Sequence, residues 1–259
     1  MLRFLLLAVV LCATVGCGAR PDQRDDLAAI TAAGTVRIGV KTDAPPFGGK
    51  VGGELIGFDI DIARAIADHL GVQAEFVPVS SADRFAKLNQ GAVDIVIATA
   101  TITRGREREV DFSLPYFQDG QGLLVGAASA IAGYQDLAGK RVVAARGSTS
   151  LANLRQYAPD AVVVEVDGTA QLLPTLVAGR ADAATSDVLI LMGLRLAADK
   201  PDAWRLAGDR FSTEPYGIAV RSNQSRLRDA VNVALQDLWT TGRWRALYDA
   251  WFGAGTPYE

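Results

Sequence analysis

Two kinds of hydrophobic pattern alternate along the first half of the chain. Short apolar, β-branched runs at 35–40, 74–79 and 93–98 are typical of strands buried in a sheet. Between them, apolar residues recur three or four positions apart over 58–70 and 81–89, which predicts amphipathic helices. The order strand, helix, strand, helix, strand predicts a parallel sheet with helices on its faces.

The same alternation begins again after Gly120 and predicts a second α/β unit. Its expected strands cover 141–145, 162–166 and 183–186, and its expected helices cover 150–157, 170–178 and 188–198. The tail adds a strand at 217–220 and two helices at 225–239 and 243–251, the second of them rich in aromatic residues. The sequence therefore predicts an α/β protein made of two units.

The first 26 residues interrupt this pattern. After Arg3, an apolar run over 4–13 is too short to span a bilayer as a helix, and small residues follow it up to Cys17, which predicts an export signal over residues 1–17. The segment 14–17 resembles a lipoprotein cleavage box, so we expect Cys17 to carry a lipid anchor, with simple secretion or release into the periplasm as the alternative. Residues 18–26 are polar and aperiodic, as a flexible tether would be. The protein is therefore expected outside the cytoplasm.

Composition and charge narrow the classes of partner. The chain has 259 residues and a formal net charge of −3, without a basic cluster, which argues against a nucleic-acid partner. Both cysteines, Cys12 and Cys17, lie in the export segment, so no disulfide is expected in the folded part. One histidine and no clustered cysteines give no metal-ligand pattern. We expect neither a metal nor a cofactor.

Candidate binding chemistry follows the strand at 93–98. Thr99, Thr101 and Arg106 come directly after that strand, at the edge where open α/β sheets bind ligands. The planar guanidinium of an arginine matches a carboxylate or a phosphate, and a nearby hydroxyl can add a directional hydrogen bond. The alternative is that Arg106 is an ordinary solvated residue.

Several short motifs in a fixed order resemble the family 3 extracellular solute-binding proteins, the amino-acid-binding proteins of ABC importers. The resemblance covers residues 33–253 and is carried by Asp43 with Pro46-Phe47, Gly57-Phe58-Asp59-Ile60-Asp61, Thr101-Ile102-Thr103 with Arg106, Asp111-Phe112-Ser113, Gly147-Ser148-Thr149, Arg180-Ala181-Asp182-Ala183, Tyr216-Gly217 and Trp251-Phe252-Gly253.

The resemblance implies a periplasmic-binding-protein type II fold, in which two lobes with mostly parallel sheets close over a ligand. Lobe 1 would comprise 27–116 and 217–259, lobe 2 would comprise 121–211, and hinges would lie at 116–120 and 212–216. The implied protein is a monomer that delivers an amino acid to an ABC permease and its ATPase. Its only contact with the membrane itself would be the lipid anchor.

The resemblance also implies roles for single residues. Arg106 matches the arginine that binds the α-carboxylate, and Thr101 matches a hydroxyl donor to the same group. Ser148 and Thr149 precede a predicted helix, whose free N–H groups suit an anion; they are expected to contact the ligand, although a helix cap is the simpler reading.

The ligand's α-ammonium would be bound by an acidic residue of the other lobe. Asp187 follows the strand at 183–186 and matches that residue of the family, with a helix N-cap as the alternative. Thr99 would offer a carbonyl or a hydroxyl to the ammonium or the carboxylate. Enclosing both charges of an amino acid requires such partners, since an unpaired buried charge is costly.

The side chain of the ligand is expected to be acidic. Arg84 matches an arginine of the acidic-amino-acid binders, and Lys41 fits the same subgroup, although either could be an ordinary solvated residue. The negative charge of Asp43 would repel an acidic ligand unless Lys41 or Arg84 neutralises it, but its carboxylate could accept a hydrogen bond from an amide. Phe47 packs either over the ligand or in the core. We therefore expect glutamate or aspartate, followed by glutamine.

Two other functions use the same scaffold. Cyclohexadienyl dehydratases resemble these binding proteins, but this sequence offers no convincing catalytic acid or nucleophile with its base, so an enzyme is not expected. A ligand sensor would have to act through a separate signalling partner.

Overall fold

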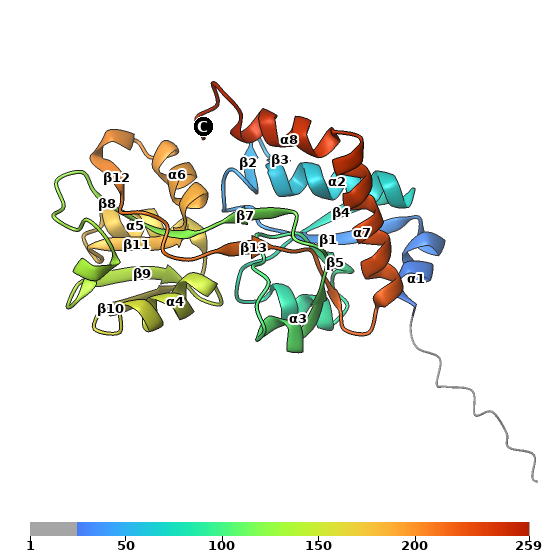
Figure 1. Cartoon of the computed structure of the whole chain (residues 1–259), viewed down its shortest axis with the longest axis horizontal. Coiled ribbons are helices and arrows are strands. Elements are labelled where there is room, and N and C mark those ends of the chain that lie inside the picture. The colour runs from blue at the N-terminus through green and yellow to red at the C-terminus, as the bar shows by residue number, and fades with distance from the viewer. Residues whose placement is uncertain (1–24, 259) are drawn as a thin grey trace, which may run out of the picture.

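The structure is a computed structural model that describes residues 25–258. Two five-stranded sheets organise it, and each forms the centre of one lobe (Figure 1). The predicted export segment, Cys17 and the tether up to residue 24 lie outside the described residues. Among residues 25–258, no helix is both long enough and apolar enough to cross a membrane.

Lobe 1 is built on the sheet with strand order β4-β1-β5-β14-β6. Its strands are β1 (Thr35–Val40), β4 (Gln73–Pro78), β5 (Ile95–Val96), β6 (Val110–Phe112) and β14 (Ala219–Arg221). Its helices are α1 (Asp26–Ala33), α2 (Phe58–Leu70), α3 (Arg84–Asn89), α7 (Ser225–Thr240) and α8 (Arg243–Phe252), with the short 3-10 helix η1 (Arg106–Arg108) and a hairpin of β2 (Gly49–Val51) and β3 (Glu54–Ile56).

Lobe 2 is built on the sheet with strand order β10-β9-β11-β8-β12. Its strands are β8 (Gln121–Gly126), β9 (Arg141–Ala145), β10 (Val162–Val166), β11 (Ala183–Asp187) and β12 (Trp204–Ala207). Its helices are α4 (Thr149–Tyr157), α5 (Leu172–Val177) and α6 (Val188–Leu196), with 3-10 helices η2 (Tyr134–Leu137), η3 (Thr169–Gln171) and η4 (Pro201–Ala203).

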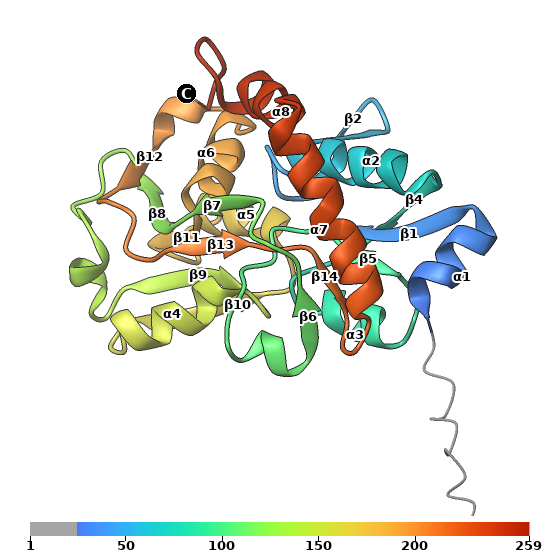
Figure 2. The same ribbon diagram turned by 45° about the vertical axis from the view of Figure 1, so that its right-hand side comes forward.

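The chain passes between the lobes along two antiparallel strands, β7 (Phe117–Asp119) and β13 (Glu214–Tyr216). They cross the middle of the molecule side by side, and β14, α7 and α8 then return to lobe 1 (Figures 1 and 2). The two-lobed fold is therefore confirmed. Each sheet is mixed but mostly parallel, as expected: only β14 in the first sheet runs antiparallel to its neighbours β5 and β6, and only β8 in the second runs antiparallel to its neighbours β11 and β12.

An aromatic core joins α8 to the base of the hinge strands. Phe47 is fully buried, and its ring centroid lies 5.0 Å from that of Phe117, 5.3 Å from Tyr216, 5.6 Å from Phe252 and 6.4 Å from Phe58. Burial of these large rings accounts for the packing of the C-terminal helix on lobe 1. Phe47 therefore belongs to the core, which is the second of the two placements expected for it.

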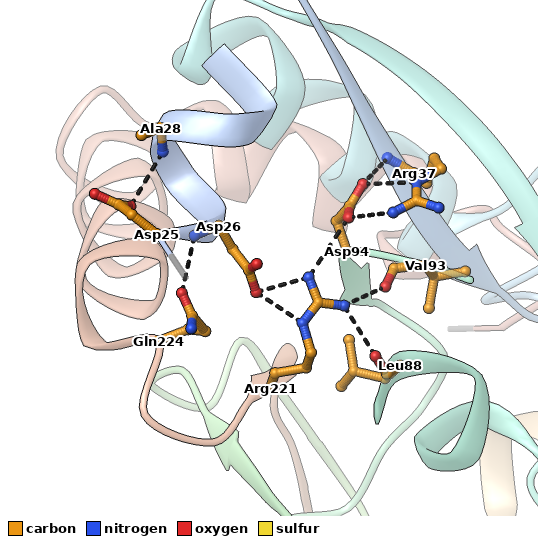
Figure 3. Close-up of polar contacts among 9 residues, drawn as sticks. All are labelled: Asp25, Asp26, Ala28, Arg37, Leu88, Val93, Asp94, Arg221 and Gln224. Carbon is orange, nitrogen blue, oxygen red and sulfur yellow. Dashed lines mark hydrogen bonds and ion pairs between the residues drawn. The ribbon is translucent and has the colours of Figure 1, made fainter. Parts of the chain in front are cut away.

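A network of charged side chains fixes the start of the fold to lobe 1 (Figure 3). Arg221 of β14 donates from Nε to Asp26 at 2.7 Å, and its Nη1 donates to the carbonyls of Leu88 and Val93 at 2.9 and 2.8 Å. Its Nη2 also lies 3.6 Å from Asp94. One guanidinium thus ties α1 to the connection between α3 and β5.

Two residues of the predicted tether belong to this folded part. Asp25 is the N-cap of α1 and accepts from the Ala28 N–H at 3.1 Å, and Asp26 is 1% exposed. The local sequence Asp-Asp before an apolar helix is a typical N-terminal signal. The fold therefore begins two residues earlier than the polar composition suggested.

Candidate functional site

The segment after β5 carries the residues predicted to bind the ligand. Thr99 has a left-handed backbone, with φ of 46°, which is unusual for a β-branched residue. Its N–H donates to Asp59 of α2 at 2.8 Å, and Asp59 also accepts from the Tyr116 hydroxyl at 2.7 Å. Burial raises the pKa of Asp59 to about 6. The contacts that hold this backbone conformation come from Asp59, which was not among the predicted site residues.

Arg106 lies at the first turn of η1, at the boundary between the lobes. Its Nη1 donates to the Thr101 carbonyl of lobe 1 at 2.8 Å, and its Nη2 donates to the Gly147 carbonyl of lobe 2 at 3.1 Å. The guanidinium also lies 5.6 Å from the ring centroid of Phe85, within the range of a cation–π contact. Burial lowers the pKa of Arg106, while nearby Glu214 and Asp187 act in the opposite direction.

Thr149 and Ser148 face this arginine from lobe 2. Ser148 is the N-cap of α4: its Oγ accepts from the Leu151 N–H at 3.1 Å and donates to the Ala145 carbonyl at 2.7 Å. Thr149 is the first residue of the helix, and its hydroxyl lies 3.3 Å from the hydroxyl of Thr101. The Ser148 side chain is therefore occupied by capping, whereas the two threonine hydroxyls meet across the gap between the lobes.

Asp187 ends β11 and is 6% exposed. Its Oδ2 accepts from the Tyr216 hydroxyl, and its Oδ1 has no hydrogen-bond partner among the described residues. Although Asp187 occupies the N-cap position of α6, its side chain makes no capping bond. Burial raises its pKa to about 7, and the charges of Asp119 and Glu214 contribute in the same direction. The site thus contains a buried carboxylate with an unpaired oxygen.

Arg84 is a buried residue that donates hydrogen bonds to the backbone of the segment after β5. It is 1% exposed, and its Nη1 donates to the carbonyls of Ala98 and Thr99 at 2.6 and 3.2 Å. Burial lowers its pKa to about 9, and the positive charge of Arg106 adds to this shift. The expected alternative of a solvated helix residue is wrong for Arg84. Its guanidinium is committed at Nη1 to backbone carbonyls, and its Nε has no partner among the described residues.

Lys41 and Asp43 extend from the loop after β1 toward lobe 2. The buried Lys41 ammonium donates to the Thr169 hydroxyl at 3.3 Å, and Asp43 Oδ2 accepts from the Ala170 N–H at 3.2 Å. Burial lowers the pKa of Lys41 to about 8, and nearby Arg84 acts in the same direction. Lys41 is therefore not the solvated residue of the alternative interpretation.

Backbone contacts between the lobes are also close. A Cβ added to Gly147 would lie 2.6 Å from the Ala82 Cα, and one added to Gly193 would lie 2.3 Å from the Pro45 carbonyl oxygen. Glycine at these two positions lets α4 and α6 of lobe 2 approach the loops of lobe 1. The structure thus has the lobes closed against each other.

The closed lobes bring together three cations, Lys41, Arg84 and Arg106, around the carboxylate of Asp187, which is chemistry for a charged polar solute. The negative charge of Asp187 acts to raise the pKa of each cation, against the lowering that burial causes. Within residues 25–258, no group of three or more His, Cys, Asp or Glu side chains could hold a metal ion. The arrangement can match a negative group at one end and a positive group at the other.

Comparison with known proteins gives the family. Residues 36–254 match the bacterial extracellular solute-binding proteins, family 3. The chain belongs to this family. This is the family of extracellular solute-binding proteins that the motifs of the sequence indicated.

Three similar proteins illustrate the range of the family. The ABC transporter glutamine-binding protein GlnH of Bacillus subtilis (strain 168) is 42% identical over 95% of this chain and 93% of its own. The L-glutamate/L-aspartate-binding protein of Pseudomonas aeruginosa is 30% identical over 86% of this chain and 78% of its own. The structure of an ancestral arginine-binding protein bound to glutamine has a TM-score of 0.82 and 39% identity, covering 85% of this chain and 98% of its own. The two curated relatives are both named as amino-acid-binding proteins, and one of them as a protein of an ABC transporter.

Sequence reasoning missed three supporting residues, namely Asp59, Phe85 and Tyr216. Tyr216 and Asp59 are part of motifs that carried the resemblance, but nothing in their spacing indicated contact with Thr99 or Asp187. Phe85 immediately follows Arg84, and its place beneath both guanidinium groups depends on the tertiary fold.

Proposed function

We propose that this protein is the receptor of an ABC importer and that it captures an amino acid between its lobes, with L-glutamine preferred and L-glutamate next. The observation that carries the proposal is the pairing of an arginine with a half-unpaired carboxylate in one closed cleft. Arg106 has five N–H groups, of which one at Nη1 and one at Nη2 donate to the Thr101 and Gly147 carbonyls, so others remain for a ligand. Asp187 offers an acceptor from lobe 2. An amino acid presents the complementary pair of charges on one carbon atom.

The α-carboxylate would bind at Arg106, with the hydroxyls of Thr101 and Thr149 as additional donors. The two hydroxyls lie 3.3 Å apart and come from opposite lobes, so one carboxylate could accept from both. The free N–H groups at the start of α4 favour an anion at the same place. Because these groups belong to both lobes, the bound carboxylate would favour the closed form.

The α-ammonium would bind at Oδ1 of Asp187. Tyr216 already satisfies Oδ2, which leaves one buried acceptor for a charged donor. The Thr99 carbonyl would be a second acceptor for the ammonium, although Arg84 already donates to it. An ammonium at this place would supply the positive charge that a buried carboxylate requires.

The side chain of the ligand would be bound by Lys41. The expectation of an acidic ligand depended on Arg84 and Lys41 together, but Nη1 of Arg84 is occupied by two backbone carbonyls. The Lys41 ammonium makes one hydrogen bond, to Thr169, and can donate to an amide oxygen as well as to a carboxylate. Together with 42% identity to a glutamine-binding protein, against 30% to a glutamate/aspartate-binding protein, this favours glutamine over the acidic ligands.

Isothermal titration calorimetry with glutamine, glutamate, aspartate, arginine and cystine tests the proposal. We expect glutamine to bind most tightly, with a dissociation constant of roughly micromolar or below, which corresponds to about 8 kcal/mol. Arg106→Ala should abolish binding, while Arg108→Ala, in the exposed part of the same turn, should leave it unchanged. The proposal fails if no amino acid binds the wild type or if Arg106→Ala binds as the wild type does.

The side-chain assignment has its own test. Lys41→Met removes the ammonium but keeps much of the apolar stem. We expect it to weaken glutamate binding more than glutamine binding, because only glutamate brings a second carboxylate. Equal losses for both ligands would count against a contact with the side chain.

The delivery partners would be an ABC permease with its ATPase, and the protein would be anchored through Cys17. Incorporation of labelled fatty acid into the wild type, and its loss in Cys17→Ser, tests the anchor. An unlabelled wild type recovered from the culture medium would favour simple secretion.

A further inference from the structure

We propose that Asp43 acts as a latch between the two lobes and does not contact the ligand. This inference rests on the proposed function. Asp43 comes from the loop after β1 in lobe 1, and its Oδ2 accepts from the Ala170 N–H of lobe 2 at 3.2 Å. The contact joins two segments that are 127 residues apart in sequence and belong to different sheets.

The surroundings of this oxygen explain why it is directed to the backbone. The position that a Cβ would take on Gly168 lies 3.0 Å from Asp43 Oδ2, so glycine leaves the carboxylate room to approach. The neighbouring Lys41 spans the same gap through its bond to Thr169. Asp43 therefore meets a segment of lobe 2, Gly168 to Ala170, that includes none of the residues proposed to bind the ligand.

Other polar contacts across the gap differ from this one. Arg106 with Gly147, and Thr101 with Thr149, are built from residues that we propose to bind the α-carboxylate. Replacing those residues would change closure and ligand contact together. Asp43 makes neither contact and acts on the proposed site only through its charge, which favours the charged form of Lys41. Its effect on closure is therefore the part of the affinity change that is common to both ligands.

A latch has a distinctive effect on affinity. It stabilises every closed complex by the same amount, whatever ligand is inside, because only the closed form contains the contact. A direct contact would instead change the affinities for glutamine and glutamate by different factors. For a charge-assisted hydrogen bond at a partly exposed site, we expect Asp43→Ala to raise every dissociation constant by about fivefold to twentyfold.

The binding test uses Asp43→Ala with Asp167→Ala as the matched control. Asp167 is exposed at the start of the same segment and pairs within lobe 2 with Arg146 at 3.5 Å. Asp43→Ala should raise the dissociation constants of glutamine and glutamate by one common factor, and mainly through faster dissociation, while Asp167→Ala leaves both unchanged. Factors that differ more than threefold between the two ligands, or no change at all, would overturn the latch.

Gly168→Ala provides an independent check of the contact. The added methyl would crowd the carboxylate at 3.0 Å, so it should weaken binding in the wild type by about twofold or more. In the Asp43→Ala background the same change should have no further effect. Additive effects of the two substitutions would contradict the proposed contact.

A measurement without ligand separates the latch from the proposed function. Fluorescent labels at Glu107→Cys and Gln156→Cys, two exposed positions on opposite lobes, report the closed fraction by single-molecule energy transfer, with Cys12 and Cys17 replaced by serine. Asp43→Ala should lower the ratio of closed to open molecules by the same factor as in the binding test. If no amino acid binds but this ratio falls, the ligand assignment fails and the latch stands; an unchanged ratio overturns the latch.

Discussion

Arg221 offers a sharp test of what holds lobe 1 together. Its side chain is 11% exposed and lies 2.6 Å from Asp26, which is itself almost fully buried. Arg221→Met keeps a side chain of similar length but removes the charge. It thereby takes a counter-ion from Asp26 and donors from the carbonyls of Leu88 and Val93.

Removing one partner of a buried ion pair costs about 3–5 kcal/mol, because the other charge stays buried. For a chain of this size, 1 kcal/mol shifts the melting temperature by about 2–4 °C, so Arg221→Met should lower it by roughly 6–20 °C. Urea unfolding followed by circular dichroism measures the free energy of unfolding directly.

The control is Arg228→Met on α7. Arg228 pairs with Asp229 at 2.9 Å, with 36% and 63% of the two side chains exposed, and an exposed pair of this kind contributes about 0–1 kcal/mol. The reasoning is refuted if Arg221→Met costs no more unfolding free energy than Arg228→Met. It would also be refuted if deleting the charge raised stability.

Three further predictions concern the cleft. The Asp187 carboxyl, with its pKa raised to about 7, must lose its proton to bind an ammonium, so affinity should fall as pH drops below 7. It should fall again as pH rises above about 8, where Lys41 loses its proton. Calorimetry at pH 6 in buffers of different ionisation enthalpy should register proton release, and its absence would contradict the assignment. Phe47→Leu should cost about 1–3 kcal/mol of stability through lost ring contacts yet leave the dissociation constant unchanged, whereas weaker binding at full stability would indicate a ligand contact. Gly193→Ala places a methyl against the Pro45 carbonyl and should weaken binding more than tenfold by opposing closure, while Gly49→Ala, with open space around it, should not.

The longer elements of the fold could be predicted because they contain enough residues for the spacing of apolar positions to distinguish a helix from a strand. The helix from Phe58 to Leu70 and the strand from Thr35 to Val40 were predicted with their observed bounds. The hairpin of β2 and β3 was not predicted, and β7 and β13 were expected only as hinges, because three-residue strands contain too few positions for an alternation. The one antiparallel strand in each mostly parallel sheet was not predicted, because strand direction depends on the path of the chain between lobes. The strands β6, β8 and β12 were not expected at all.

The candidate site could be predicted only in part. Arg106 was found because it follows the predicted strand at 93–98, and Asp187 was found through the resemblance to the family; their roles stay predictions until binding is measured. The burial of Arg84 could not be anticipated, since its partners are backbone carbonyls that a sequence does not display. Asp59 contacts Thr99 across 40 residues of sequence, and Tyr216 contacts Asp187 across 29. Sequence spacing did not indicate either contact.

The double crossing of the chain between the lobes also has a consequence for biosynthesis. All five strands of the second sheet lie between residues 121 and 207, so that half can form as soon as this continuous segment has crossed the membrane. The first sheet waits for β14, at residues 219–221, which separates β5 from β6. The half that begins first along the chain is therefore completed last, and until the last forty or so residues have also crossed the membrane its apolar faces stay partly uncovered.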